Sequence, residues 1–185
     1  KKDGTVPVMG RITVDGSPVV YHQDLPSNTS TLGRTPLSGN GKVDNGEKAY
    51  VIFGLRKGGR SYYALDVSEP LNPKIAWSLR PDEAANIPSS RLLSSSVDIA
   101  TTRTVVGDMA YATAMPAVGR VLYTASGKRQ VRPAVFLGGG PSVPAVEQAS
   151  FSSRLMGRSA MALDATTGEF LQVWDLPNKA TIGSV

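Results

Sequence analysis

Short runs of β-branched and aromatic residues, separated by turn residues, recur along this chain and predict β-strands. The run 49–54 is apolar and ends at a glycine, the run 58–66 is rich in tyrosine and ends in Ala-Leu-Asp, and the run 74–79 contains a tryptophan. Runs of this kind, separated by Gly, Pro and Asn, are typical of consecutive antiparallel strands. We therefore expect a meander over residues 49–79.

A second copy of the same pattern lies further along the sequence. The apolar run recurs at 131–138, the Ala-Leu-Asp ending at Asp66 recurs at Asp164, and the tryptophan strand of Trp77 recurs at Trp174. An internal repeat of a four-strand unit is typical of β-propeller blades. The sequence therefore predicts an all-β fold, a β-propeller fragment of about two four-stranded blades with long inter-strand loops.

The remaining strands of the two blades are predicted from weaker signals. The segment 10–21, with an Asp-Gly turn in its middle, would supply the inner strand of the first blade. The segment 111–123, rich in small residues, would supply that of the second. The last two strands are expected at 158–164 and 169–176. Only 82–93 has a helical composition, interrupted by a proline, so few helices are expected.

These strands divide the chain into blades and insertions. Long polar loops in a compact domain are usually functional or mobile, so they are the predicted working surfaces. A propeller closes with about 4–8 blades, so we expect the chain to be part of a longer polypeptide. The predicted parts are a first blade at 1–79 with a long loop at 22–46, an inter-blade insertion at 80–106, a second blade at 107–177 with an insertion at 140–157, and a link to the next blade at 178–185.

Five residues have a predicted structural role within the blades. The Asp164 carboxylate can accept hydrogen bonds from backbone N–H groups two and three residues on, and Gly168 can adopt a positive φ. Asp66 stands at the same place in the first copy, so it is interpreted as a turn residue and not as half of a catalytic carboxylate pair. Trp77 and Trp174 are expected to pack between neighbouring blades.

Charge and composition exclude several classes of function. The net charge is +5, from 20 Lys and Arg against 15 Asp and Glu, but the basic residues are scattered and do not accompany aromatics spaced for base stacking. Nucleic acid is therefore not an expected partner. The chain has no cysteine, which excludes disulfides and thiolate chemistry. No apolar run approaches the roughly 20 residues of a membrane helix.

Catalytic chemistry finds little support in the sequence. His22 is the only histidine, so a zinc site built from several imidazoles is excluded within this chain. His22 and Asp24 could form a catalytic pair, but a lone loop histidine near an aspartate is more often a surface residue. The glycine run 138–140 is followed by neither a Lys-Ser/Thr pair nor a helix, so it is not a phosphate loop. The sequence therefore predicts a protein that is not an enzyme.

The second repeat resembles a widespread propeller motif. Residues 162–168 with Trp174 resemble the repeat of pyrroloquinoline-quinone-type propellers. That repeat is shared by quinoprotein dehydrogenases, by an outer-membrane assembly scaffold and by other propellers, so it implies an architecture and leaves the function open.

The first repeat resembles a more specific family. The segments 14–19 and 53–68, followed by Pro73 and Trp77, resemble the C-terminal propeller of PilY-type proteins, the tip-associated adhesin and biogenesis factors of bacterial type IV pili. The resemblance extends over residues 8–79 and, more loosely, over 107–177. It implies a cell-surface protein at the pilus tip, exported through the periplasm, that serves pilus assembly, surface adhesion and twitching motility.

The resemblance also implies partners and a metal to look for. The expected partners are minor pilins at the pilus tip, the rest of a longer chain of its own, and a host or abiotic surface. Members of the family often carry an EF-hand-like calcium loop, for which the nearest candidates are Asn40, Asp44 and Glu47. Lys42 stands where an oxygen ligand is needed, and calcium takes 6–8 oxygens. We interpret this segment as a polar loop and predict no cofactor.

Two rival functions remain open. A quinoprotein dehydrogenase would need carboxylate and amide metal ligands and stacking aromatics, which this sequence does not assemble. A periplasmic propeller scaffold for outer-membrane protein assembly would be expected to keep short turns, unlike the long insertions here.

Overall fold

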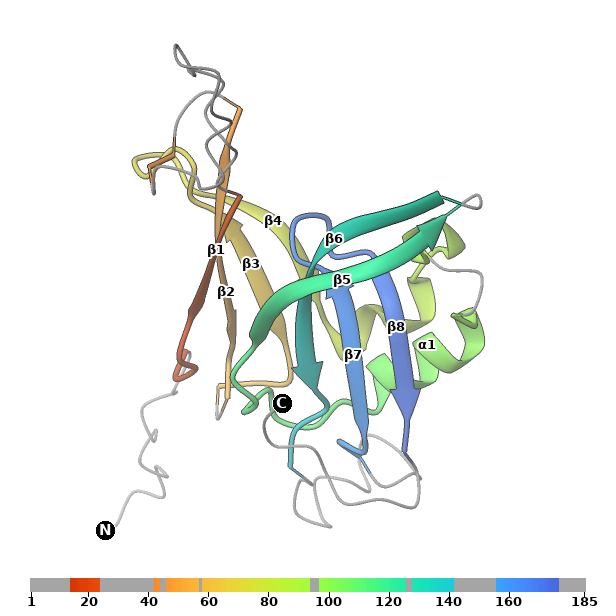
Figure 1. Cartoon of the computed structure of the whole chain (residues 1–185). Helices are drawn as coiled ribbons and strands as arrows, with labels where there is room; N and C mark the ends of the chain where they lie inside the picture. The colour runs from red at the N-terminus through yellow and green to blue at the C-terminus, as the bar shows by residue number, and fades with distance from the viewer. Residues whose placement is uncertain are drawn as a thin grey trace, which may run out of the picture.

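The structure is a computed structural model of the chain (Figure 1). The residues that it describes are 14–23, 42–43, 46–56, 58–93, 97–125, 128–141 and 156–176.

Within the described residues, the strands form two four-stranded antiparallel sheets, each with its strands in sequence order. This confirms the predicted all-β fold with two four-stranded units. The first sheet contains β1 (Val19–Gln23), β2 (Lys48–Gly54), β3 (Tyr62–Asp66) and β4 (Lys74–Leu79). The second sheet contains β5 (Ala117–Ala125), β6 (Lys128–Gly138), β7 (Ser159–Asp164) and β8 (Phe170–Asp175).

The two inner strands differ from their predicted positions. Of the predicted inner strand at 10–21, residues 14–18 form no strand and β1 begins only at Val19, while residues 10–13 lie outside the described part. A Cβ on Gly16 would stand 1.9 Å from the Gly54 carbonyl oxygen, so this segment lies directly against the end of β2. β1 instead continues to Gln23, into the predicted loop.

β5 begins at Ala117 and not at residue 111. The six residues before it include Ala112, which makes an isolated bridge to Arg56 at the end of the first sheet. The Arg56 N–H donates to the Ala112 carbonyl oxygen at 3.1 Å, so this segment joins the two sheets before β5 starts.

The stretch 80–106 is helical in large part, and only its first half, 82–93, has the helical composition noted in the sequence. It contains the 3₁₀ turns η1 (Pro81–Asn86) and η2 (Ser89–Arg91) and the helix α1 (Ile99–Gly107). Six of the nine α1 residues are β-branched Ile, Thr or Val, and such residues have low intrinsic helix propensity.

Capping and tertiary contacts stabilise α1 instead. The Asp98 carboxylate accepts from the Thr101 N–H at 2.7 Å, which satisfies one of the open donors at the helix start. Val105 and Val106 are buried in the same core cluster as Phe170 of β8. In Figure 1, α1 lies beside β8.

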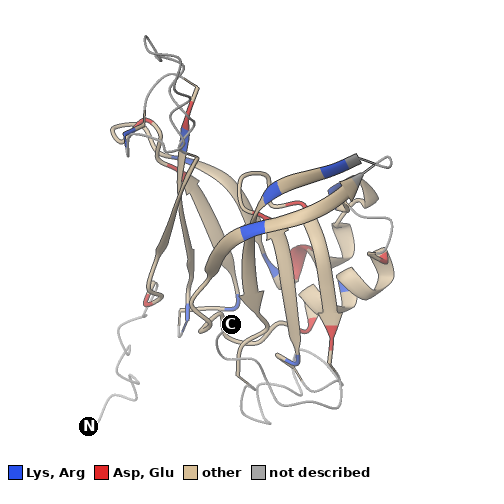
Figure 2. Ribbon diagram, in the orientation of Figure 1, with Lys and Arg blue, Asp and Glu red and all other residues tan. Residues whose placement is uncertain are grey.

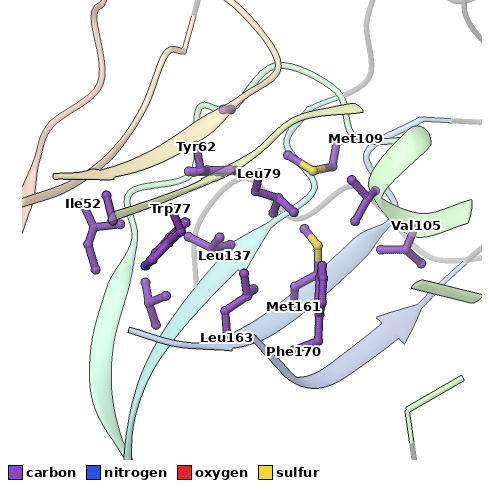
Figure 3. Packing of buried hydrophobic residues seen from close by; sticks show 14 of the residues in the cluster. Ile52, Tyr62, Trp77, Leu79, Val105, Met109, Leu137, Met161, Leu163 and Phe170 are labelled. Carbon is purple, nitrogen blue, oxygen red and sulfur yellow. The ribbon is translucent and has the colours of Figure 1, made fainter. Parts of the chain in front are cut away.

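One hydrophobic core joins the two sheets and α1 (Figure 3). Alternate residues of each strand enter it, as the period-two geometry of a strand requires. The Tyr62 hydroxyl donates to the Gly138 carbonyl oxygen at 2.9 Å, and burial raises the pKa of Tyr62. The large side chains labelled in Figure 3 are Ile52, Tyr62, Trp77, Leu79, Val105, Met109, Leu137, Met161, Leu163 and Phe170.

Candidate functional site

The turn that joins β7 to β8 is built around one buried carboxylate. Asp164 is 1% exposed, and its Oδ1 accepts from the Thr166 N–H at 2.9 Å and from the Thr167 N–H at 3.2 Å. Its Oδ2 faces the Arg132 guanidinium at 3.2 Å. Gly168 closes the turn with a φ of +71°, a conformation that side-chain-bearing residues rarely adopt.

Trp77 of the first sheet lies on this turn of the second sheet. Its Nε1 donates to the Ala165 carbonyl oxygen at 3.0 Å, and the side chain is buried. A Cβ on Gly168 would stand 2.6 Å from Trp77 Cγ, so the indole lies directly over the glycine backbone. Arg91 donates to the Gly168 carbonyl oxygen at 2.8 Å and stacks over the Phe170 ring. We call the contact of Trp77 with the turn at 164–168 the inter-sheet seam.

The first copy of the motif has different surroundings. The Asp66 carboxylate accepts from the Ser68 hydroxyl and N–H and pairs with Lys48 at 3.1 Å, and these hydrogen bonds, first of all that of the Ser68 hydroxyl, lower the pKa of Asp66. Trp174, the counterpart of Trp77, is 40% exposed. The described residues show no contact of Trp174 with a neighbouring blade of the kind that was predicted.

The calcium candidates are only partly placed. Asn40 and Asp44 lie outside the described residues. Glu47 is buried, and its Oε2 is 3.5 Å from His22 Nε2. The segment that the structure describes contains no group of three or more His, Asp or Glu residues placed to hold a metal ion.

His22 has a different partner from the one that the sequence suggested. It lies in β1 and not in a loop, while Asp24 falls outside the described residues. His22 pairs with Ala49 of β2, and Glu47 lies two residues before Ala49, so its side chain is on the same face of the sheet and meets His22 diagonally. A sequence reading limited to near neighbours of His22 could not find this contact.

An open cavity of about 440 Å³ lies between the start of β3, η1 and the end of α1. Arg60 donates from Nε to the Met109 carbonyl oxygen at 2.6 Å and from Nη2 to that of Gly107 at 2.7 Å. Arg103 donates to the Ile87 carbonyl oxygen. These two arginines therefore satisfy backbone carbonyls at the ends of helical segments, and burial lowers the pKa of Arg60.

Arg60 lies just before β3, and its half-buried guanidinium cross-links this segment to the end of α1. The cavity lining also includes Pro81, Asp82, Thr104 and Asp108.

No protein-family model and no curated protein matches the sequence. Among solved structures, the chain is similar to the crystal structure of the Pseudomonas aeruginosa PilY1 C-terminal domain, with 22% sequence identity and a TM-score of 0.46. The similarity covers 92% of this chain and 23% of that chain. In the described residues, no helix has the length and apolarity needed to cross a membrane.

Proposed function

We propose that this chain is the propeller region of a PilY-type pilus-tip protein, with a non-enzymatic role in type IV pilus assembly, surface adhesion and twitching motility. The observation that carries the proposal is the sequence resemblance of segments 14–19 and 53–68, with Pro73 and Trp77, to that family. Its partners would be minor pilins at the fibre tip, the rest of a longer chain, and the surface to which the cell adheres.

The seam supports a scaffold role for the repeated residues. Trp77, Asp164 and Gly168 are all used in contacts within and between the sheets. The stretch 80–106 also packs on the core through α1, so it belongs to the scaffold as well. Recognition of partners would then fall to the outer loops and to exposed strands.

The first test is genetic and microscopic. The gene for this protein would be deleted in the source cells. The deletion strain would then be complemented with one of three alleles: the wild type, Trp174→Ala as a matched control, or Trp77→Ala. We expect deletion to abolish surface filaments and twitching, the first two alleles to restore them, and Trp77→Ala to fail because the seam is lost. Immunogold labelling with an antibody against residues 107–177 would mark filament tips or bases.

Two other outcomes would overturn the proposal. Normal filaments on deletion, with quinone-dependent oxidation lost, would indicate the dehydrogenase. Normal filaments with outer-membrane proteins failing to assemble would indicate the periplasmic scaffold.

A further inference from the structure

β5 and β6 extend beyond the rest of the second sheet as a two-stranded arm (Figure 1). β5 pairs with residues 128–136 of β6, whereas β7 pairs only with residues 134–138. Residues 120–125 and 128–133 therefore pair with each other and, within the described part of the chain, with no third strand. We call these residues the β5–β6 arm.

The arm has an open edge on the side of β7. The Pro133 carbonyl oxygen accepts from the Ala165 N–H at 3.2 Å, so the backbone groups of Pro133 point toward β7. Backbone polar groups alternate between the two sides of a strand, so those of Val131 and Arg129 point to the same side. No backbone partner for them exists among the described residues.

One face of the arm is covered and the other is open. Val121 and Tyr123 pack on one side, in the cluster that includes Leu93. On the opposite side, Leu122 and Val131 are directly paired across the strands and are 57% and 65% exposed. The open face also carries two exposed arginines at either end of this apolar pair, Arg120 and Arg129.

The arm is uniformly basic. The sequence between Asp108 and Glu147 contains no acidic residue, and Figure 2 shows basic residues on both strands of the arm. Its four basic residues are Arg120, Lys128, Arg129 and Arg132. Arg132 pairs with Asp164, but neither Arg120 nor Arg129 has an acidic partner in the described residues.

Charge on a sheet edge can also be a protective device, because it discourages edge-to-edge pairing with other chains. Two features of this arm go beyond protection. A protected edge does not need an exposed Leu122–Val131 pair on the same face as its cations. The exposed backbone groups of Val131 and Arg129 also stand next to that apolar pair, so an added strand would gain hydrogen bonds, apolar contact and charge pairing at one place.

We propose that the open edge of β6 binds an extended acidic segment of another protein by strand addition. On the open face, the added strand would place an acidic side chain beside Arg129 and an apolar side chain beside Val131. Because these two positions are two residues apart on β6, the partner segment would read acidic, any residue, apolar. A second copy of this chain is disfavoured as occupant, because two basic arms repel each other. The proposal does not depend on the pilus assignment.

The binding test uses a fluorescein-labelled eight-residue peptide in which threonine alternates with glutamate and valine. One control peptide has lysine in place of glutamate, and another is N-methylated at the backbone nitrogens of the hydrogen-bonding edge. Fluorescence anisotropy with the protein should show about tenfold weaker binding for each control. Binding of the acidic peptide should also weaken as salt is raised.

Charge reversal on the arm provides the matched variants. Arg129→Glu should weaken binding of the acidic peptide by about tenfold or more. Lys74→Glu makes the same change in net charge on an exposed residue of β4 and should have little effect. Circular dichroism and urea melts would verify that both variants fold as the wild type does.

Amide hydrogen exchange distinguishes strand addition from general charge attraction. Saturating acidic peptide should slow exchange at Val131 and Arg129 by about tenfold or more, because a new backbone hydrogen bond protects an amide. Binding without protection at these amides, or equal weakening by Arg129→Glu and Lys74→Glu, would overturn the proposal.

Two further results would overturn the proposed occupant. Sedimentation that shows a wild-type dimer dispersed by Arg129→Glu would assign the edge to a second copy. Binding to phosphatidylserine vesicles, with no preference for the acidic over the lysine peptide, would assign the arm to a membrane surface.

Discussion

The two copies of the repeat share a local sequence pattern but differ in what covers them. Trp77 ends the first copy and lies buried on the turn of the second sheet, with its indole N–H bonded to Ala165. Trp174 ends the second copy, on β8, and is 40% exposed. The two tryptophans also differ in register, because Trp77 pairs with Ala64, two residues before Asp66, whereas Trp174 pairs with Ala160, four residues before Asp164. The sequence repeat therefore places a tryptophan in the fourth strand of each sheet, whereas register and the neighbouring sheet decide what surrounds the indole.

The two aspartates also differ in exposure. The Asp164 side chain is 2% exposed and the Asp66 side chain 24% exposed. The buried carboxylate sits in the turn that receives Trp77, and the more exposed one ends β3, where it pairs with Lys48. A copy whose turn is covered by a tryptophan should contribute more to stability than a copy whose turn is not, and the predictions below test this difference.

Trp77→Ala should have the largest effect on stability. It removes a buried aromatic side chain from the seam and leaves the buried Ala165 carbonyl oxygen without its donor. We expect the free energy of unfolding to fall by about 3–5 kcal/mol, as for other buried large-to-small changes. Urea denaturation followed by far-UV circular dichroism measures this without relying on tryptophan fluorescence.

Trp77→Phe separates packing from hydrogen bonding in the same seam. It keeps an aromatic ring but removes the Nε1–H donor, so a loss of about 1–3 kcal/mol is expected from the unsatisfied carbonyl. A loss as large as that of Trp77→Ala would mean that the shape of the indole, and not the apolar area that it buries, determines the stability of the seam.

Gly168→Ala should have the next largest effect. The new Cβ would meet Trp77 Cγ at 2.6 Å and would also occupy a φ of +71°. We expect a loss of about 2–4 kcal/mol from strain and overpacking combined.

Gly46→Ala is the matched control for Gly168→Ala. Gly46 has a φ of +84°, but a Cβ there would have no atom within 4 Å. Its loss should be limited to the backbone strain of about 1–2 kcal/mol. Equal losses in unfolding midpoint for the two variants would show that Trp77 moves away from Gly168 at no cost.

Local signals explain which parts of the fold could be predicted from the sequence. β4 was predicted with its observed ends because a turn-rich segment and Pro81 bound its apolar run. The Asp164 turn could be anticipated because its hydrogen bonds join residues two and three positions apart.

Long-range contacts explain the rest. α1 was missed because its Thr- and Val-rich sequence has little helical tendency, and burial of Val105 and Val106 decides its conformation. The acceptor of the Trp77 indole, Ala165, is 88 residues away, so the repeat could suggest contact between blades but not the atoms involved. The arm was missed for a related reason, since the composition of β6 does not reveal where β7 stops pairing with it.

Trp174→Ala should change stability far less than Trp77→Ala. The indole is 40% exposed, so we expect a loss below about 1 kcal/mol. Urea melts at two protein concentrations measure it. A loss that approaches that of Trp77→Ala, or one that grows with protein concentration, would show that Trp174 is covered in solution by another copy of the chain.

Ser68→Ala should have the smallest effect, and one that depends on pH. The Ser68 hydroxyl is the main cause of the lowered pKa of Asp66. A carboxyl whose pKa is lowered by folding adds stability above its unfolded pKa, near 4, and this stability is lost as the pH falls through the folded value. The variant should therefore be slightly less stable than the wild type at pH 7, by less than about 1 kcal/mol because the site is partly solvated. Below pH ~3 the difference should shrink to the part that comes from the hydrogen bond of the Ala49 N–H to the Ser68 Oγ, which does not depend on the charge of Asp66. Ser78→Ala, on β4 opposite Tyr63, removes a hydroxyl that has no such carboxylate partner and should show no pH-dependent difference. A gap between Ser68→Ala and the wild type that stays constant from pH 7 to pH ~3 would mean that the hydroxyl acts through its bond with the Ala49 N–H or through packing, and not through the charge of Asp66.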